Sequence, residues 1–254
     1  MRALITNDDG VESPGIRTLA VTAAELGLEV LVAAPSWDSS GASASLTSVE
    51  QDGRFMVREH RIDGLDGVSY GIEAAPAFIT RAAVHEAFGP PPDVVLSGIN
   101  RGYNCGHAVL HSGTVGAAST AHTFGLPAVA FSVDATEDTR WDTAQLVVRS
   151  VLEWFARERP RVLLNVNVPG VGPEQLRGLR QAQLAAFGAV TANVTEAGRG
   201  YVAMEYRAVE AEGEPGTDVA LLAEGYATFT ALSPVCEAHT PGAEVLSELL
   251  PAGA

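Results

Sequence analysis

The sequence predicts an α/β protein with a Rossmann-like, mostly parallel sheet, flanking helices and a smaller β-rich C-terminal extension. Short apolar segments alternate with helical stretches, which is the order that a parallel sheet with crossover helices requires. This alternation stops near residue 172, where strand-like patterns take over. We therefore expect a core over residues 1–170 and an extension over residues 171–254 that serves as an oligomerisation element.

The first elements are the clearest. Residues 2–6 form an apolar strand pattern. Residues 14–26 predict a helix, because a proline occupies the first turn and apolar side chains recur on one face. A second apolar strand pattern covers residues 28–34 and ends at Pro35.

The middle of the chain continues the pattern. Residues 54–75 predict short strands, and residues 76–88 predict a helix. A strand is expected at 93–97, followed by a long polar loop and a helix over 113–124 that ends at a glycine.

Three further elements complete the predicted core. Residues 128–131 predict a strand, and residues 141–156 predict a helix whose apolar stripe faces the core. Residues 162–168 predict the last strand of the core.

Composition excludes several classes of protein. The chain has 254 residues, 46% of them hydrophobic, and a formal net charge of −15. A polyanion would be repelled, so no nucleic-acid polymer is expected as a partner. No apolar run approaches the roughly 20 residues that cross a bilayer, so no membrane is expected. The N-terminal residues do not resemble a signal peptide, and Cys105 and Cys236 suit a reducing compartment, which predicts a cytoplasmic location.

All 16 basic residues are arginines. Without lysine the chain cannot carry a Walker A phosphate lysine, a pyridoxal phosphate Schiff base or a Ser-Lys dyad. Electrophilic assistance must come from arginine, backbone N–H groups or a metal ion.

Two adjacent carboxylates, Asp8 and Asp9, follow the first predicted strand directly. Adjacent carboxylates repel each other unless a cation lies beside them, so their position favours a bound divalent metal. An acidic turn is the alternative, because Asp-Gly is a common turn dipeptide.

Three polar, glycine-rich loops follow predicted strands, at residues 7–10, 39–43 and 97–114. Ligands of open parallel sheets bind at the carboxyl ends of the strands, so these loops can meet around one centre. Oxygen ligands favour Mg²⁺ or Mn²⁺ over Zn²⁺. The sequence therefore predicts one divalent cation per subunit. Its predicted ligands are Asp8, Asp9, Ser40 and Asn100.

The segment Ser112-Gly113-Thr114 opens a predicted helix. Its hydroxyls and backbone N–H groups predict an anion site supported by the helix dipole. Ser112 is alternatively a helix N-cap, and the two roles are compatible.

Together these motifs make the chain resemble the SurE survival-protein family of metal-dependent phosphatases that act on nucleoside monophosphates. The residues that carry the resemblance are Thr6 to Val11, Pro14-Gly15-Ile16, Ser40 to Ser43, Ser97 to Asn104, Ser112 to Val115, Asn165 to Pro169 and Gly216-Thr217-Asp218.

The resemblance implies a metal-dependent phosphomonoesterase, a 5'/3'-nucleotidase, that forms a homodimer or homotetramer by exchanging its extension. It places the metal on Asp8, Asp9, Ser40 and Asn100 and the phosphate near Asn104 and residues 112–114. The chain departs from the family at Ala74–Phe78, where the usual Thr and Asp are missing, and at His111. A different small phosphorylated metabolite is therefore an alternative substrate, and a catalytically weak ligand-binding oligomer is an alternative function.

For the reaction, Asp8 or Asp9 is expected to orient the attacking water and accept its proton. The N–H groups near Gly113 and Thr114, with Asn104, are expected to hold the phosphate oxygens. His111 is a candidate acid for the leaving oxygen, or else a packed histidine, and Arg101 is a candidate phosphate contact. A dinucleotide-dependent oxidoreductase is the rival enzyme class, although the first turn lacks the glycine pattern that this class requires.

Overall fold

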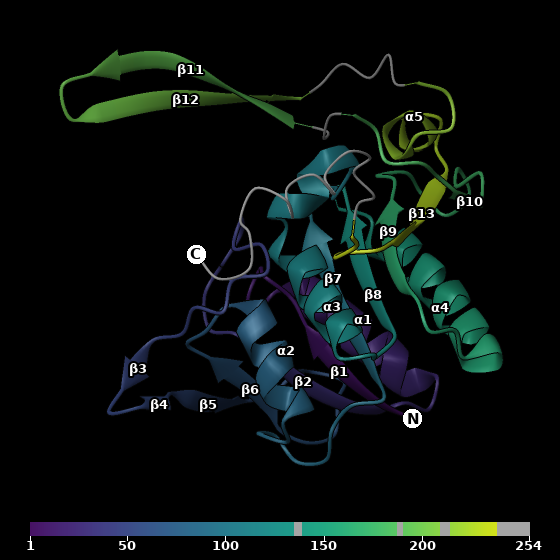
Figure 1. Cartoon of the computed structure of the whole chain (residues 1–254). Coiled ribbons are helices and arrows are strands. Elements are labelled where there is room, and N and C mark those ends of the chain that lie inside the picture. The colour runs from purple at the N-terminus through teal and green to yellow at the C-terminus, as the bar shows by residue number, and fades with distance from the viewer. Residues whose placement is uncertain (135–138, 187–189, 209–213, 238–254) are drawn as a thin grey trace, which may run out of the picture.

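A nine-stranded sheet forms the centre of the computed structural model, which describes residues 1–134, 139–186, 190–208 and 214–237 (Figure 1). Its strand order is β10-β13-β9-β8-β7-β1-β2-β6-β5. The parallel strands are β1 (Arg2–Thr6), β2 (Glu29–Pro35), β6 (Ser69–Ile72), β7 (Val94–Arg101), β8 (Ala128–Val133) and β9 (Leu163–Val168). At the edges, β5 (Val57–His60) and β13 (Ala227–Leu232) run antiparallel to their neighbours, and β10 (Leu179–Gln181) pairs parallel to β13.

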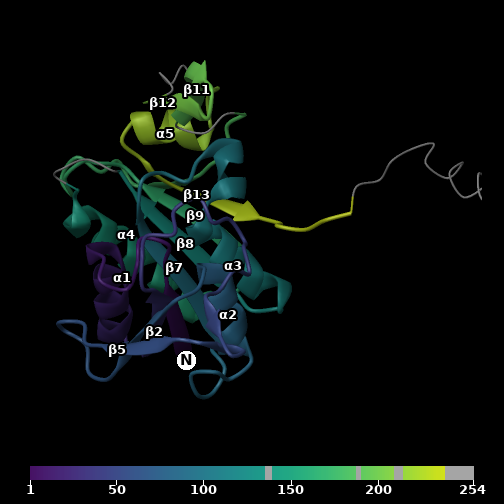
Figure 2. The same cartoon turned by 90° about the vertical axis from the view of Figure 1, so that its left-hand side faces the viewer.

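Helices cover both faces of this sheet (Figure 2). On one face lie α1 (Pro14–Glu25) and α4 (Trp141–Glu158), and on the other lie α2 (Pro76–Val84) and α3 (Gly113–Thr123). The apolar stripes of each helix pair pack with the strands into a separate hydrophobic cluster on each face. Strands buried on both faces read as continuous apolar runs, as β8 does with all six residues buried.

The strand order reverses between β1 and β7, which are direct neighbours. From β1 the chain builds outward through β2 and β6, then returns to β7 and builds the other way through β8 and β9. Such a reversal opens a crevice at the carboxyl ends of the two central strands. The loops that begin at Asn7 and at Gly102 lie at this crevice, because β1 ends at Thr6 and β7 ends at Arg101.

The α/β fold class is confirmed, with some changes at the ends of elements. The second helix ends at Val84 and not near Phe88, because Glu86 adopts a left-handed φ of 65°. Strand β7 continues to Arg101, beyond the predicted end at Ser97, after a register shift against β8. Tertiary pairing extended this strand through a polar segment that local sequence alone assigned to a loop.

Some residues after 170 belong to the central sheet, and others form a separate hairpin. Strands β10 and β13 are part of the central sheet, so the predicted boundary at 170/171 does not separate the sheet from the extension. The short helix α5 (Asp218–Ala223) packs beside β13. The hairpin of β11 (Val190–Gly198) and β12 (Tyr201–Ala208) projects away from the body (Figure 1).

Three small elements complete the description. Strands β3 (Glu50–Gln51) and β4 (Arg54–Phe55) form a second hairpin, and the 3-10 helix η1 (Gly106–His111) precedes α3. Among the described residues, none of the helices has the length and apolar character needed to cross a bilayer.

Candidate metal and phosphate site

Asp8 lies just beyond β1 and is buried, with 3% of its surface exposed. Both of its carboxylate oxygens accept hydrogen bonds from Thr114 at the start of α3. The Thr114 N–H donates to Oδ2 over 3.0 Å, and the Thr114 hydroxyl donates to Oδ1. The positive end of the helix dipole also favours an anion at this place. Thr114 therefore fixes both the position and the orientation of the Asp8 carboxylate.

Gly113 allows this close approach between α3 and Asp8. A Cβ atom at Gly113 would lie 2.8 Å from the Asp8 Cβ and 2.8 Å from Asp8 Oδ2. Real side chains do not tolerate such contacts, so only glycine fits here. At the start of α1, Gly15 has a comparable role, because a Cβ there would lie 1.9 Å from the carbonyl oxygen of Ile99.

Asp9 is only partly buried and bonds to the other central strand. Its Oδ2 accepts the N–H of Arg101 at 3.1 Å. Burial, and next the charge of Asp8, raise the pKa of Asp9 to about 6. Burial also raises the pKa of Asp8, while the hydrogen bonds from Thr114 act in the opposite direction. Two neighbouring carboxyls with raised pKa values are the electrostatic signature of a site that gains from a cation.

Ser40 belongs to the loop after β2, and this loop is attached to Asp8. The Ser39 N–H donates to the Asp8 carbonyl at 2.7 Å, and the Ser39 hydroxyl donates to the same oxygen at 3.2 Å. Next to it, the Ser40 N–H and hydroxyl both donate to Asp38 Oδ1, at 2.9 and 2.5 Å. These bonds explain why a serine of one loop is held beside the aspartates of another.

Asn100 lies near the end of β7, next to the residue that bonds Asp9. Its Nδ2 donates to the Gly102 carbonyl at 2.7 Å, which fixes how the amide oxygen is presented. On the opposite loop, Asn7 Nδ2 donates to the Gly10 carbonyl and to Ser13 Oγ, at 3.0 and 2.7 Å. The turn that carries Asp8 and Asp9 is thus held by its own side chains.

The predicted ligands fit a hard cation. Asp8, Asp9, Ser40 and Asn100 offer only oxygen atoms, which suit Mg²⁺ or Mn²⁺. Across the described ranges, no three His, Cys, Asp or Glu side chains lie close enough to share an ion. A cation held by this carboxylate pair would therefore be completed by neutral oxygens, as Ser40 and Asn100 can supply.

The start of α3 has the N-cap that the sequence predicts, while its predicted phosphate site stays a prediction. Ser112 caps the helix, since its Oγ accepts the Val115 N–H at 3.0 Å. Thr114 uses its N–H on Asp8, so this group does not have the position that the sequence predicted for holding phosphate. For the Gly113 N–H, the described residues provide no acceptor. Gly113 is thus the donor at this helix end that a phosphate oxygen can use.

Asn104 lies in a buried amide network and not at an open surface. Its Nδ2 donates to Ser132 Oγ at 2.8 Å, and its N–H donates to Asn167 Oδ1 at 2.9 Å. Its carbonyl accepts from Asn165 and Asn167. The alternating asparagines on β9 share one face of the strand, which is the signal that points to this network.

Asp218 had no predicted role at the site, although Gly216-Thr217-Asp218 carries part of the family resemblance. Its buried carboxylate accepts the N–H of Gly106 at 2.8 Å and of Ala185 at 3.0 Å. Burial raises the pKa of the neighbouring Cys105 thiol, and Asp218 adds to that rise. The start of α5 thereby holds the loop that contains Asn104. The acidic residue in Gly216-Thr217-Asp218, after a helix-capping threonine, was the available signal.

His111 and Arg101 are both exposed and come from different elements. His111 ends η1 and is exposed, and its carbonyl accepts the Ser43 N–H at 3.2 Å. Arg101 is exposed, and its charge lowers the pKa of Asp9. Arg101 is thus the cation placed beside the carboxylate pair.

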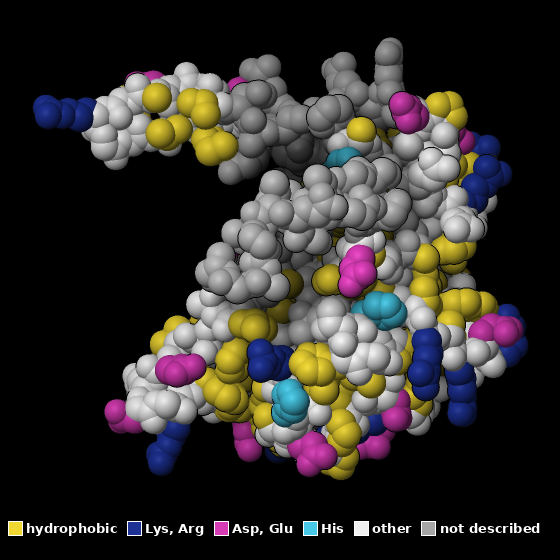
Figure 3. All heavy atoms as spheres, viewed as in Figure 1, with side chains coloured by type: hydrophobic (Ala, Val, Ile, Leu, Met, Phe, Trp, Pro, Cys, Tyr) yellow, Lys and Arg dark blue, Asp and Glu magenta, His cyan; other side chains and the backbone are white. Residues whose placement is uncertain are grey.

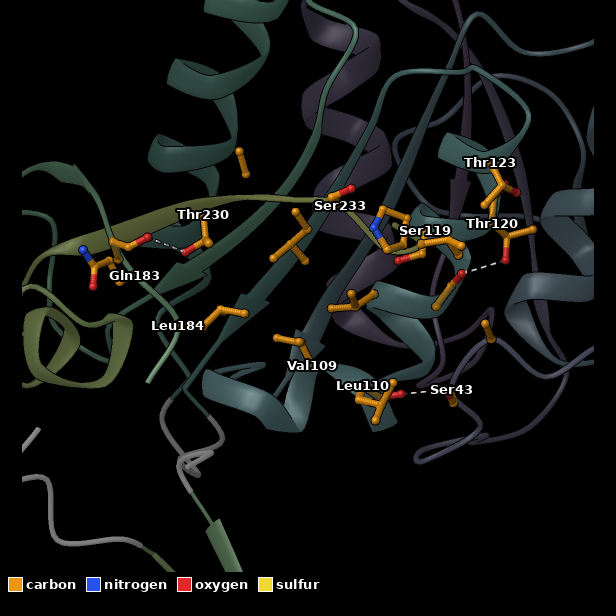
Figure 4. A pocket seen from close by; sticks show the side chains of 18 of the residues that line it. Ser43, Val109, Leu110, Ser119, Thr120, Thr123, Gln183, Leu184, Thr230 and Ser233 are labelled. Atoms are coloured by element: carbon orange, nitrogen blue, oxygen red, sulfur yellow. Dashed lines mark hydrogen bonds between the residues drawn. The ribbon is translucent and has the colours of Figure 1, made fainter. Parts of the chain in front are cut away.

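A separate groove of about 710 Å³ lies between α3, η1 and the end of β13 (Figure 4). Hydroxyls of Ser119, Thr120 and Thr123 line one side, and Val109 and Leu110 line another. None of the predicted metal or phosphate residues lines this groove.

The fold and these residues define a class of protein: an open α/β sheet with a carboxylate pair and a helix N-terminus at its topological switch point. The family described as "Survival protein SurE" matches residues 3–189. The chain belongs to the SurE family.

Individual relatives agree with this assignment. The chain is 35% identical over 237 residues to the 5'-nucleotidase SurE of Legionella pneumophila (strain Lens), covering 91% of this chain and 90% of that relative. It is 36% identical over 255 residues to the 5'/3'-nucleotidase SurE of Shigella dysenteriae serotype 1, covering 98% and 96%. The crystal structure of the SurE protein from Aquifex aeolicus is similar with a TM-score of 0.75 at 28% identity, covering 98% of both chains.

Proposed function

We propose that this protein is a metal-dependent phosphomonoesterase that hydrolyses nucleoside monophosphates. The observation that carries the proposal is the Asp8–Asp9 pair, whose carboxyl pKa values are both raised at the crevice between β1 and β7. Relatives named 5'-nucleotidase and 5'/3'-nucleotidase support nucleotides as the substrate class.

One Mg²⁺ or Mn²⁺ ion per subunit would be held by Asp8, Asp9, Ser40 and Asn100. Such an ion supplies a positive charge that offsets the negative charge developing on the phosphate oxygens. Since the chain has no lysine, Arg101 is the side chain beside Asp9 that can add positive charge there.

The two aspartates have different roles in this proposal. Thr114 engages both oxygens of Asp8, so Asp8 serves to hold the ion. Asp9 is more exposed, and within the described residues only its Oδ2 accepts a protein hydrogen bond, from the Arg101 N–H, so its other oxygen can accept a proton. We assign Asp9 to orient the attacking water and accept its proton as the ester P–O bond breaks.

The phosphate would lie at the start of α3. Gly113 offers its backbone N–H, and Ser112 and Thr114 shape the helix end around it. Asn104 supports the other side of this proposed phosphate site through its buried hydrogen-bond network. His111 is the candidate acid for the leaving oxygen.

The decisive experiment combines one substitution with a substrate panel. Phosphate release from p-nitrophenyl phosphate, nucleoside monophosphates and sugar phosphates is measured with Mn²⁺ or Mg²⁺. Asp8→Asn should lower metal-stimulated release by about 100-fold or more, because a cation contributes several kcal/mol to such a reaction. Asp63→Asn, which removes an exposed carboxylate, serves as the control.

The panel also separates the alternatives. Turnover of sugar phosphates with little turnover of nucleotides would favour another phosphorylated metabolite, for which the departures at Ala74–Phe78 and His111 are the reason. No turnover of any ester would favour a ligand-binding oligomer. Full activity of Asp8→Asn would overturn the metal assignment.

For the assembly we propose a homodimer or homotetramer that covers the β11–β12 hairpin. Val194 and Met204 pair across this hairpin, and Val202 lies on the same face two residues from Met204. Their exposed fractions are 61%, 50% and 62% in this order. Figure 3 shows the apolar side chains gathered on the projecting hairpin. An isolated two-stranded hairpin is marginally stable in water, so a second copy of the chain is the expected cover.

The cytoplasmic location also remains part of the proposal.

A further inference from the structure

Asp38 lies two residues before the predicted metal ligand Ser40 and takes its hydroxyl hydrogen. Asp38 Oδ1 accepts the Ser40 hydroxyl at 2.5 Å and the Ser40 N–H at 2.9 Å. A hydroxyl has one hydrogen to donate and two lone pairs. Because the hydrogen points at Asp38, the lone pairs of Ser40 Oγ point elsewhere.

The same segment is anchored on the carboxylate pair. Ser39, between Asp38 and Ser40, donates both its N–H and its hydroxyl to the Asp8 carbonyl. The negative charge of Asp38 also repels the charges of Asp8 and Asp9, and this contributes to raising the pKa of both carboxyls. Asp38 is thus a third acidic group whose charge acts on the pair.

Asp38 is not placed as a third carboxylate ligand. In the part of the chain that the structure describes, no three acidic, histidine or cysteine side chains could hold one ion together. Its contact with the centre runs through Ser40, so its action on a cation would be indirect.

We propose that Asp38 is a positioning residue for the metal: it holds the Ser40 hydroxyl with its hydrogen turned away, so that the oxygen lone pairs face the cation. This inference rests on the proposed ligand role of Ser40. A hydroxyl oxygen ligates a cation only through a lone pair, and a partner that accepts its hydrogen makes it a better donor. Outer partners of this kind affect metal affinity by about 10- to 100-fold.

The test measures Mn²⁺ affinity directly, by calorimetry and by the electron paramagnetic resonance signal of free Mn²⁺, without substrate. The variants are Asp38→Ala, Asp38→Asn, Ser40→Ala and the double variant Asp38→Ala with Ser40→Ala. Asp66→Ala is the matched control, because it removes an exposed carboxylate near the start of β2, far along the strand from the ligand loops. Circular dichroism and the urea midpoint check that each variant is folded.

Asp38→Ala should weaken Mn²⁺ binding by about 10-fold or more. Asp38→Asn should lose less, because its amide oxygen still accepts the Ser40 hydroxyl. In the Ser40→Ala background, Asp38→Ala should cause little further loss, because the residue through which it acts is missing. Asp66→Ala should bind as the wild type does.

Two results would overturn the proposal. Equal losses for Asp38→Asn and Asp38→Ala, undiminished in the Ser40→Ala background, would mean that Asp38 acts by its charge or as a direct ligand. Wild-type affinity in Asp38→Ala would mean that Asp38 has no role. Failure of the metal site itself is distinguishable, since the wild type would then bind no Mn²⁺ and Asp8→Asn would change nothing.

Discussion

Thr114 donates its backbone N–H and its hydroxyl to the two oxygens of the Asp8 carboxylate, across 106 positions of the chain. This pair joins the end of β1 to the start of α3. These two hydrogen bonds therefore connect the predicted metal ligand directly to the predicted phosphate end of the helix.

Removing the Thr114 hydroxyl should weaken the site. Thr114→Val keeps the shape and the N–H but leaves one oxygen of a buried carboxylate without its donor, at a cost of about 1–3 kcal/mol in unfolding free energy. Mn²⁺ affinity should fall with it. Thr114→Ser retains a hydroxyl and should recover most of both losses. Urea denaturation and Mn²⁺ titration measure the two effects. Equal behaviour of the Val and Ser variants would show that the hydroxyl is not needed.

Metal affinity should depend on pH through Asp9. Its folded-state pKa of about 6 lies above the ordinary value of 3.8, so the folded chain holds this proton more tightly than the unfolded chain. A cation must displace the proton, so Asp9 should make Mn²⁺ affinity rise about tenfold per pH unit below pH 6 and contribute no further rise above it. Calorimetry at several pH values in buffers of different ionisation enthalpy measures the affinity and the protons released.

Without metal, the unfolding free energy should also depend on the pKa of Asp9, but it should fall as the pH rises, whereas the metal affinity rises. Between pH 3.8 and about 6 the folded state binds more protons than the unfolded state, so the unfolding free energy should fall as pH rises through this window. Asp9→Asn should flatten this part of the profile. An unchanged profile in Asp9→Asn would assign the pH dependence to other groups.

Loss of the Asp218 carboxylate should destabilise the fold and loosen the loop at Asn104. Asp218→Ala leaves the N–H groups of Gly106 and Ala185 buried without acceptors, which costs roughly 1–3 kcal/mol for each group. Asp218→Asn keeps an acceptor oxygen and should lose less. Urea denaturation measures the stability, with Glu153→Gln at an exposed position of α4 as the control. Wild-type stability in Asp218→Ala would contradict the role of this carboxylate.

A charge on the apolar face of the hairpin should break the proposed assembly. Val202→Glu or Met204→Glu should reduce the molar mass in solution, measured by light scattering after size-exclusion chromatography, because burying an unpaired carboxylate at an interface is costly. Arg199→Glu at the hairpin turn makes a larger charge change off this face and should leave the mass unaltered. A monomeric wild type would refute the assembly.

Local sequence patterns predicted the central part of the fold well. The apolar runs before Asn7, Pro35 and Ser97 predicted β1, β2 and most of β7, because buried parallel strands need continuous apolar side chains. The chemistry of residues 7–10 indicated a cation because neighbouring carboxylates repel in any fold.

Other features depended on distant parts of the chain. The hydrogen bonds of Asp218 to Gly106 and of Thr114 to Asp8 join residues more than a hundred positions apart, and no local pattern encodes such a partner. For the same reason, strand pairing and not local propensity decided that β10 and β13 belong to the central sheet.

The sequence by itself determined the fold class, the oxygen-rich loops and the carboxylate pair, because periodicity and adjacent charge act over a few residues. Only the tertiary structure decided which donor serves which acceptor: Thr114 holds Asp8, no described residue takes the Gly113 N–H, and Asn104 lies in a buried network. Hydrogen bonds need atoms within about 3 Å and correct angles. Chain folding sets those distances, and the order of residues alone does not.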